Sequence, residues 1–191
     1  MEEVEVKFLN INPQEIEEKL KEIGAKKVFE KMYRRRVFDY PDLRLDKSGA
    51  WVRLRDEGDK ITLVFKQRVG IKGHNGKTND ETMEEIEVTV SDFEKTAAIL
   101  RQIGLTEKFY EENRRIRYVL DEIEFDIDFW PQLEPYLEIE ASSWNKIEKA
   151  INLLGLNPTD KKIFSTHQIY QLNGINENDY QEITFEKMVK K

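Results

Sequence analysis

Charged and apolar residues alternate at the start of the chain, over residues 3–8. Successive side chains of a β-strand point to opposite faces of a sheet. This alternation therefore predicts a strand with Glu3, Glu5 and Lys7 on one face and apolar side chains on the other. A strand at the surface of an ordinary antiparallel sheet has the same pattern. This chain differs because the pattern recurs along the sequence.

Later segments show the same alternation, and each predicts a further strand with one charged and one apolar face. Some of these segments carry basic residues and others carry carboxylates two positions apart. The charged residues are Arg53 and Arg55, Lys66, Glu85 and Glu87, Arg115 and Arg117, Asp126 and Asp128, and Glu138 and Glu140. The chain is thus predicted to be rich in antiparallel strands whose charged faces differ in sign.

Helix signals lie between these strands. Residues 12–15 combine a capping Asn, a Pro at the first helical position and a Glu three residues after the cap, which predicts a helix that ends at Gly24. A capping box at Ser91 predicts a second helix that ends at Gly104, and a third helix is expected over 143–154. Their apolar stripes predict that the helices cover the apolar side of the sheet.

The two parts of the chain repeat one another. In each part an acidic alternating strand is followed by a capped helix, an Ile-Gly pair and a strand with an Arg cluster. This duplication predicts two halves of one closed sheet within a single domain. The domain covers residues 1–191, with half-repeats at about 1–80 and 81–141 and a helical carboxy-terminal segment over 142–191.

The composition limits the kinds of protein and partner. The 191 residues include no cysteine, which excludes disulfides and thiolate metal sites, and a net charge of −7 argues against general nucleic-acid binding. No apolar run approaches the ~20 residues of a membrane span, and the first residues lack the features of a signal peptide. We therefore expect a cytoplasmic protein that binds neither nucleic acid nor membranes.

The charged strand faces are expected to converge. If the sheet closes, the helices cover its apolar side and the charges line a lumen. Buried charges must be paired or bind ions, so such a lumen suits a polyanion together with metal ions.

Candidate site residues follow from this arrangement. Arginine and lysine side chains suit phosphate oxygens, and carboxylates suit Mg²⁺ or Mn²⁺. The phosphate-binding candidates are Arg53, Arg55, Lys66, Arg115 and Arg117, with one of Arg34, Arg35 and Arg36 on the same face. The metal-binding candidates are Glu3, Glu5, Asp126, Asp128, Glu138 and Glu140. For Glu85 and Glu87 two roles stay open, metal ligand or partner of the arginines.

The run over residues 3–7 resembles the Glu-x-Glu-x-Lys signature of the CYTH superfamily, the triphosphate tunnel metalloenzymes that include class IV adenylate cyclases and thiamine triphosphatases. The resemblance continues through the other charged segments to about residue 141. It implies an α+β fold in which eight antiparallel strands close into a tunnel with helices outside. It also implies chemistry on a triphosphate with a divalent metal ion.

The mechanism that this resemblance implies is phosphoryl transfer to water. Metal ions and basic residues neutralise the triphosphate, and Lys7 and Glu5 are the catalytic candidates, with Lys7 also binding substrate. We expect a hydrolase of tripolyphosphate, thiamine triphosphate or a nucleoside triphosphate, as a monomer or homodimer. Two alternatives stay open: an adenylate cyclase that makes cyclic AMP and pyrophosphate, and a non-catalytic binder of polyphosphate or nucleotide.

Overall fold

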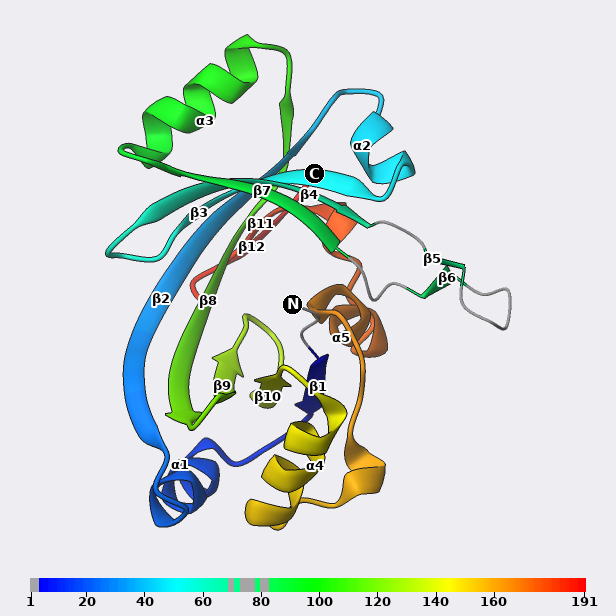
Figure 1. Ribbon diagram of the computed structural model, residues 1–191. Coiled ribbons are helices and arrows are strands. Elements are labelled where there is room, and N and C mark those ends of the chain that lie inside the picture. The colour runs from blue at the N-terminus through cyan, green and yellow to red at the C-terminus, as the bar shows by residue number, and fades with distance from the viewer. Residues whose placement is uncertain (1–3, 69–70, 73–77, 80–82) are drawn as a thin grey trace. The chain divides into compact units, whose positions relative to one another are not determined.

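The computed structural model describes residues 4–68, 71–72, 78–79 and 83–191 (Figure 1). The chain forms two compact units. Unit 1 comprises residues 1–32 and 113–177, and unit 2 comprises residues 33–112 and 178–191. Two long strands, β2 (Lys26–Asp39) and β8 (Thr106–Leu120), contribute residues to both units. No helix in these described ranges is long and apolar enough to cross a membrane.

Unit 1 contains one side of a large sheet with two helices on its apolar face. Its strand order is β1-β10-β9-β8-β2, and β1, β10, β9 and β8 are antiparallel to their neighbours. The elements are β1 (Val4–Phe8), α1 (Pro13–Glu22), β9 (Ile123–Phe129), β10 (Tyr136–Ala141) and α4 (Trp144–Leu153). Figure 1 shows α4 beside β10 and β1, which it contacts.

The core of unit 1 explains why its charged residues share one face. Val6 and Ile139 from the strands pack with Leu20 of α1 and Ile147 of α4, and all four side chains are fully buried. Because side chains alternate along a strand, burying these residues turns the intervening charged residues to the opposite face.

Unit 2 contains the strands of the large sheet in the order β2-β3-β4-β7. Its elements are α2 (Arg44–Lys47), β3 (Ala50–Asp56), β4 (Ile61–Arg68), β7 (Met83–Val90) and α3 (Phe93–Gln102), with β5 (Ile71–Lys72) and β6 (Thr78–Asn79) as a separate pair. Phe38 and Leu54 pack against Phe93, Ala97 and Leu100 of α3. This packing again leaves the other face of the strands to charged residues.

The helix ends follow the sequence closely. Asn12 caps α1 by accepting from the backbone N–H of Gln14 at 3.1 Å. The second helix begins one residue later than predicted, because Asp92 rather than Ser91 is the cap and accepts from Lys95 N–H at 2.9 Å. Gly104 follows the end of this helix with φ +100°, a left-handed conformation that favours glycine.

The end of the chain adds helical turns and two short strands. These elements are η1 (Pro158–Asp160), α5 (Thr166–Leu172), η2 (Glu177–Asp179), β11 (Tyr180–Ile183) and β12 (Met188–Lys190). Strands β11 and β12 pair with one another, and β11 also pairs in parallel with β8. They bring the large sheet to ten strands.

The predicted α+β fold with a large antiparallel sheet and helices is confirmed, but closure and the count of eight strands are wrong. The strand path ends at β1 and at β7, which do not pair with each other in the described residues. One physical reason lies in unit 1. The backbone N–H and C=O of Lys7 that face away from β10 bond to Lys162, at 2.8 and 2.9 Å. The interpretation of the chain as a single domain of two half-repeats stays a prediction.

Candidate functional site

The charged face of unit 1 carries a row of four side chains across four adjacent strands. Lys7 lies opposite Glu138, Glu138 opposite Asp126, and Asp126 opposite Arg117. The Lys7 ammonium is 3.0 Å from Glu138, and the Arg117 guanidinium donates to both oxygens of Asp126 at 2.7 and 2.6 Å. The register of the strands thus places two carboxylates between two cations.

Arg115 joins this row to the carboxylate of Asp128. Its guanidinium donates twice to Asp128, at 2.8 and 2.6 Å, once to Asp126 at 2.5 Å and once to Glu138 at 3.2 Å. The three carboxylates are 0, 1 and 7% exposed respectively. Asn113, also buried, lies 3.5 Å from Asp128. One cation therefore binds three buried anions.

The pKa values record this imbalance of charge. Burial, with the neighbouring charges of Glu138 and Asp126, raises the pKa of Asp128 to about 6, against the opposing effect of Arg115. Burial also disfavours the charge of Glu138, but Arg115 and Lys7 outweigh it and lower the pKa of that carboxyl to about 2. For Glu138 the nearby cations thus outweigh the effect of burial and favour the charged carboxylate. For Asp128 they do not.

A second row on the same face contains only carboxylates. Glu5, Glu140 and Glu124 lie opposite one another on β1, β10 and β9. Glu5 is exposed and pairs with Lys7, and Glu124 pairs with Arg117. Side chains opposite one another in neighbouring strands are close, and like charges there are unfavourable. The position of Glu3 lies outside the described residues.

These residues suit a divalent cation by chemistry and charge. Lys7, Arg115 and Arg117 supply three positive charges, whereas six carboxylates share the face: Glu5, Glu124, Asp126, Asp128, Glu138 and Glu140. Carboxylate oxygens are the ligands that Mg²⁺ and Mn²⁺ prefer. As they stand, no three acidic or histidine side chains in the described ranges are grouped to hold an ion. Lys7, Arg115 and Arg117 are bonded to them instead.

The charged face of unit 2 is basic. Arg53 and Arg55 project from β3, and Lys66 from β4. Arg35 lies opposite Arg55 and so is the member of its three-arginine run that joins this face. Arg36 is on the other face, where it bonds to glutamates of α3 and β8. We call Arg35, Arg53, Arg55 and Lys66 the basic cluster.

Carboxylates neutralise part of the basic cluster and leave Arg53 without an ion pair among the described residues. Arg55 pairs with Glu57, and Lys66 pairs with the exposed Glu85. Arg53 Nε is buried and has no hydrogen-bond partner in the part of the chain that the structure describes. Glu87, also exposed, lies across β4 from Arg53, with Val64 between them in register.

The pKa values of the basic cluster show an excess of positive charge. Burial, together with the charges of Arg55 and Arg35, lowers the pKa of Arg53 to about 9. Burial and the charge of Arg53 also lower the pKa of Lys66. A guanidinium stays protonated at neutral pH, so unit 2 holds positive charge that an anion would stabilise.

Sequence reasoning missed some of these residues. Glu124 could have been predicted, because it precedes Asp126 by two positions and so shares its face. Glu57 could have been predicted in the same way, because it follows Arg55 by two positions. Asn113 carries no such signal, because its contact with Asp128 depends on which strands are neighbours.

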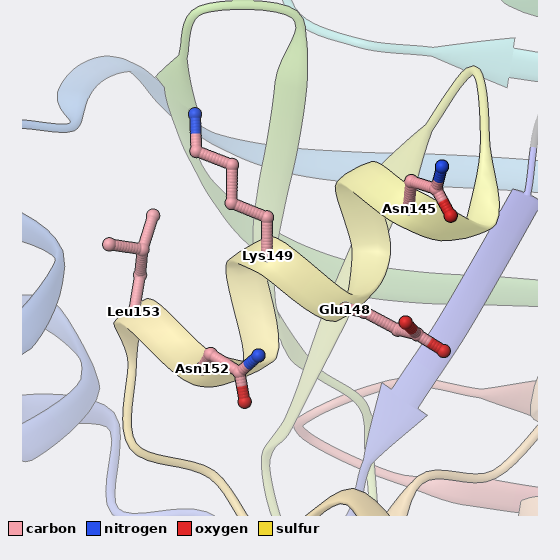
Figure 2. A pocket seen from close by; sticks show the side chains of 5 residues that line it. All are labelled: Asn145, Glu148, Lys149, Asn152 and Leu153. Carbon is pink, nitrogen blue, oxygen red and sulfur yellow. The ribbon is translucent and has the colours of Figure 1, made fainter.

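A separate hollow lies on the outer side of α4 in unit 1. Asn145, Glu148, Lys149, Asn152 and Leu153 line it. All five are exposed side chains of one helix, and Figure 2 shows them projecting away from its axis. Its lining consists of these exposed side chains of a single helix, so this hollow is not a candidate site.

Comparison with known proteins identifies the family. Residues 1–166 match the CYTH domain. The chain belongs to the CYTH family. A Methanocaldococcus jannaschii protein named "Putative adenylate cyclase" is 31% identical to this CYTH chain over 144 residues, which are 74% of this chain and 78% of that protein.

Solved structures share the CYTH fold of this chain. A Pyrococcus horikoshii protein has a TM-score of 0.68 at 22% identity, over 87% of this chain and 98% of its own. A Hippeastrum protein, described as a "Putative adenylyl cyclase" with a dominant triphosphatase activity, has a TM-score of 0.61 at 13% identity, over 90% and 95% of the two chains. At these identities the likeness establishes the fold alone.

Proposed function

We propose that this CYTH protein is a divalent-metal-dependent hydrolase of triphosphates, either inorganic tripolyphosphate, thiamine triphosphate or a nucleoside triphosphate. The observation that carries the proposal is the state of Arg53. Arg53 is half-buried, with a buried Nε that has no hydrogen-bond partner and no ion pair among the described residues, and it lies beside two further arginines and a lysine. This excess of positive charge calls for a multiply charged anion. Membership of the CYTH family and the activity described for the Hippeastrum protein point to a triphosphate.

In this proposal the basic cluster binds the phosphates. Arg53 and Arg55 donate to phosphate oxygens with the paired geometry of a guanidinium, and Lys66 acts as a point charge. Lys66 gives up its bond to Glu85, which is exposed and can be hydrated instead. The roles of Glu85 and Glu87 are thus to balance charge in the free protein. Arg115 and Arg117 would bind phosphate only by giving up their bonds to carboxylates. We therefore assign them mainly to neutralising the carboxylates of unit 1.

The carboxylates of unit 1 are the proposed metal ligands. Glu3, Glu5, Asp126, Asp128, Glu138 and Glu140 are the proposed set, to which the register adds Glu124. When bound, Mg²⁺ or Mn²⁺ neutralises charge on phosphate oxygens and makes water more acidic. Lys7, held by Glu5 and Glu138, orients the attacking water by donating to it. Glu5, which is exposed, accepts a proton from that water as the water oxygen bonds to phosphorus and the bond from phosphorus to the leaving phosphate breaks.

The test is a product assay on the purified protein. Tripolyphosphate, thiamine triphosphate and ATP are each incubated with Mg²⁺ or Mn²⁺, and orthophosphate, pyrophosphate and cyclic AMP are measured. Orthophosphate release supports the hydrolase. Cyclic AMP with pyrophosphate would instead support the adenylate cyclase that the name of the M. jannaschii relative suggests. Tight binding without either product would mean a non-catalytic binder.

A further inference from the structure

The last part of the chain lies beyond the match to the CYTH domain. The family match stops at residue 166, so α5, β11 and β12 lie beyond it or at its edge. Residues 178–191 belong to unit 2, the unit that holds the basic cluster. We call β11 and β12, residues 180–190, the carboxy-terminal hairpin.

The carboxy-terminal hairpin has a defined turn and a buried anchor. Thr184 N–H donates to Lys187 C=O at 2.9 Å, and the Thr184 hydroxyl accepts from Lys187 N–H at 3.1 Å. Lys187 also pairs with Glu182 at 2.8 Å. Ile183 is fully buried, with Met188 opposite it on the second strand. The hairpin is therefore packed onto unit 2 through Ile183.

The hairpin covers the edge of β8 at Glu111. Strand β11 runs parallel to β8, with Glu182 opposite Tyr110 and Ile183 opposite Glu111. Paired residues share a face of the sheet, so Ile183 lies on the same face as Glu111. Glu111 is only 4% exposed. An apolar side chain thus helps to exclude water from a carboxylate.

Glu111 connects the hairpin to the basic cluster through Arg35. Its carboxylate lies 3.7 Å from Arg35 Nε, and Arg35 in turn lies opposite Arg55. Two guanidinium groups in that position repel each other, so Arg35 needs a counter-charge to stay beside Arg55. The attraction of Glu111 is stronger where water is excluded.

We propose that the carboxy-terminal hairpin sets the affinity of unit 2 for a triphosphate by keeping Glu111 buried against Arg35. Arg35 is then a positioned phosphate-binding residue, and Glu111 is the residue that positions it. This inference rests on the proposed function, because it takes a triphosphate as the ligand of the basic cluster.

The test measures tripolyphosphate binding by calorimetry to the full chain and to a chain that ends at Glu177. The shorter chain is expected to bind roughly tenfold more weakly, and so is the full chain with Arg35→Ala. Combining the two changes is expected to cause no further loss, because both remove the same interaction. If the hairpin had only a general structural role, the two losses of affinity would multiply. That result would overturn the proposal, and so would equal affinity of the full and shortened chains.

Two further variants keep the test decisive if the shortened chain folds poorly. Glu111→Gln keeps the hairpin and removes the charge, and it is expected to give the same tenfold loss and the same lack of additivity with Arg35→Ala. Lys190→Ala, an exposed hairpin position, is the matched control and should bind as the unchanged chain does. If the unchanged chain binds no tripolyphosphate, the proposed function fails. If it binds and Glu111→Gln binds equally well, only the role of the hairpin fails.

Discussion

At the scale of single residues, Arg53 carries an electrostatic cost in the folded protein. It has neither an ion pair nor a partner for Nε in the described ranges, and two arginines lie near it. Replacing it by alanine should therefore remove repulsion and at the same time remove a phosphate donor.

Arg53→Ala is expected to weaken tripolyphosphate binding about 100-fold, the loss of a charge-assisted contact. The melting temperature should stay the same or rise. Arg34→Ala is the matched control, because Arg34 is half exposed and paired with Asp56 at 2.5 Å. Calorimetry and thermal unfolding measure both effects. A fall in stability with unchanged binding would contradict the role of Arg53.

Arg115 has the opposite character, because it donates to three buried carboxylates and is the cation that Asp128 bonds to among the described residues. Arg115→Ala is expected to lower the free energy of unfolding by about 3–5 kcal/mol, since it leaves buried negative charge without a partner. Arg114→Ala, at a neighbouring and more exposed position paired with Glu30, should cost no more than about 1 kcal/mol. Urea unfolding measures the free energy of unfolding of both variants. Equal losses would show that Arg115 does not neutralise the buried carboxylates.

Glu5 tests the proposed chemistry without disturbing the core. Glu5→Gln is expected to lower the rate of phosphate release by about 100-fold or more, because the proton acceptor is lost. The fold should be unchanged, since Glu5 is exposed. The rate is measured with tripolyphosphate and Mg²⁺, and circular dichroism checks the fold. A variant with full activity would remove Glu5 from the mechanism.

The face of the sheet on which a charged residue lies could be predicted where alternation determines it. Arg53 and Arg55 lie on one face because Leu54, which stands between them, points the other way into the core. The register between β3 and β4 places Lys66 on the same face. The pairing of Arg115 with Asp128 could not be predicted, because the offset between β8 and β9 is set by strand contacts rather than by either segment alone.

At the scale of elements, helix ends depend on local signals that the sequence contains. Gly104 has φ +100° and nothing within 4 Å of the position that a Cβ would occupy. Gly104→Ala is therefore expected to cost about 1 kcal/mol through backbone strain alone. Gly104→Asn should cost less, because Asn tolerates this conformation. Urea unfolding measures both, and an alanine variant as stable as the unchanged chain would contradict the strain.

The longer strands and helices in the first 154 residues were predictable for the same local reasons. The short elements α2, β5 and β6, and the strands β11 and β12, were not. Residues 180–190 are short and mixed in polarity, so alternation gives no clear signal there. Their strand character comes from the free edge of β8 at Tyr110 and Glu111, which is a tertiary feature.

At the scale of the whole molecule, the buried carboxylates of unit 1 already have cationic partners. Removing metal with EDTA is therefore expected to abolish phosphate release without unfolding the protein, and added Mg²⁺ or Mn²⁺ should restore release. Activity and circular dichroism are measured on the same sample. Unfolding in EDTA would show that metal is part of the fold, and activity that persists in EDTA would contradict the proposed metal dependence.

Closure of the sheet was the main whole-molecule feature that sequence reasoning got wrong. Alternation in each strand says which face is charged but not where the first and last strands of a sheet find partners. Here Lys162, far from β1 in sequence, bonds to the outer edge of that strand at Lys7.

The bond between Lys7 and Lys162 has a consequence for behaviour in concentrated solution. An uncovered outer strand offers a row of backbone groups to which a strand of another molecule can add, and fibrous aggregates grow in this way. At β1 the chain occupies the middle of that row with its own backbone, through the two bonds between Lys7 and Lys162. Edge-to-edge association of two molecules through β1 is therefore disfavoured.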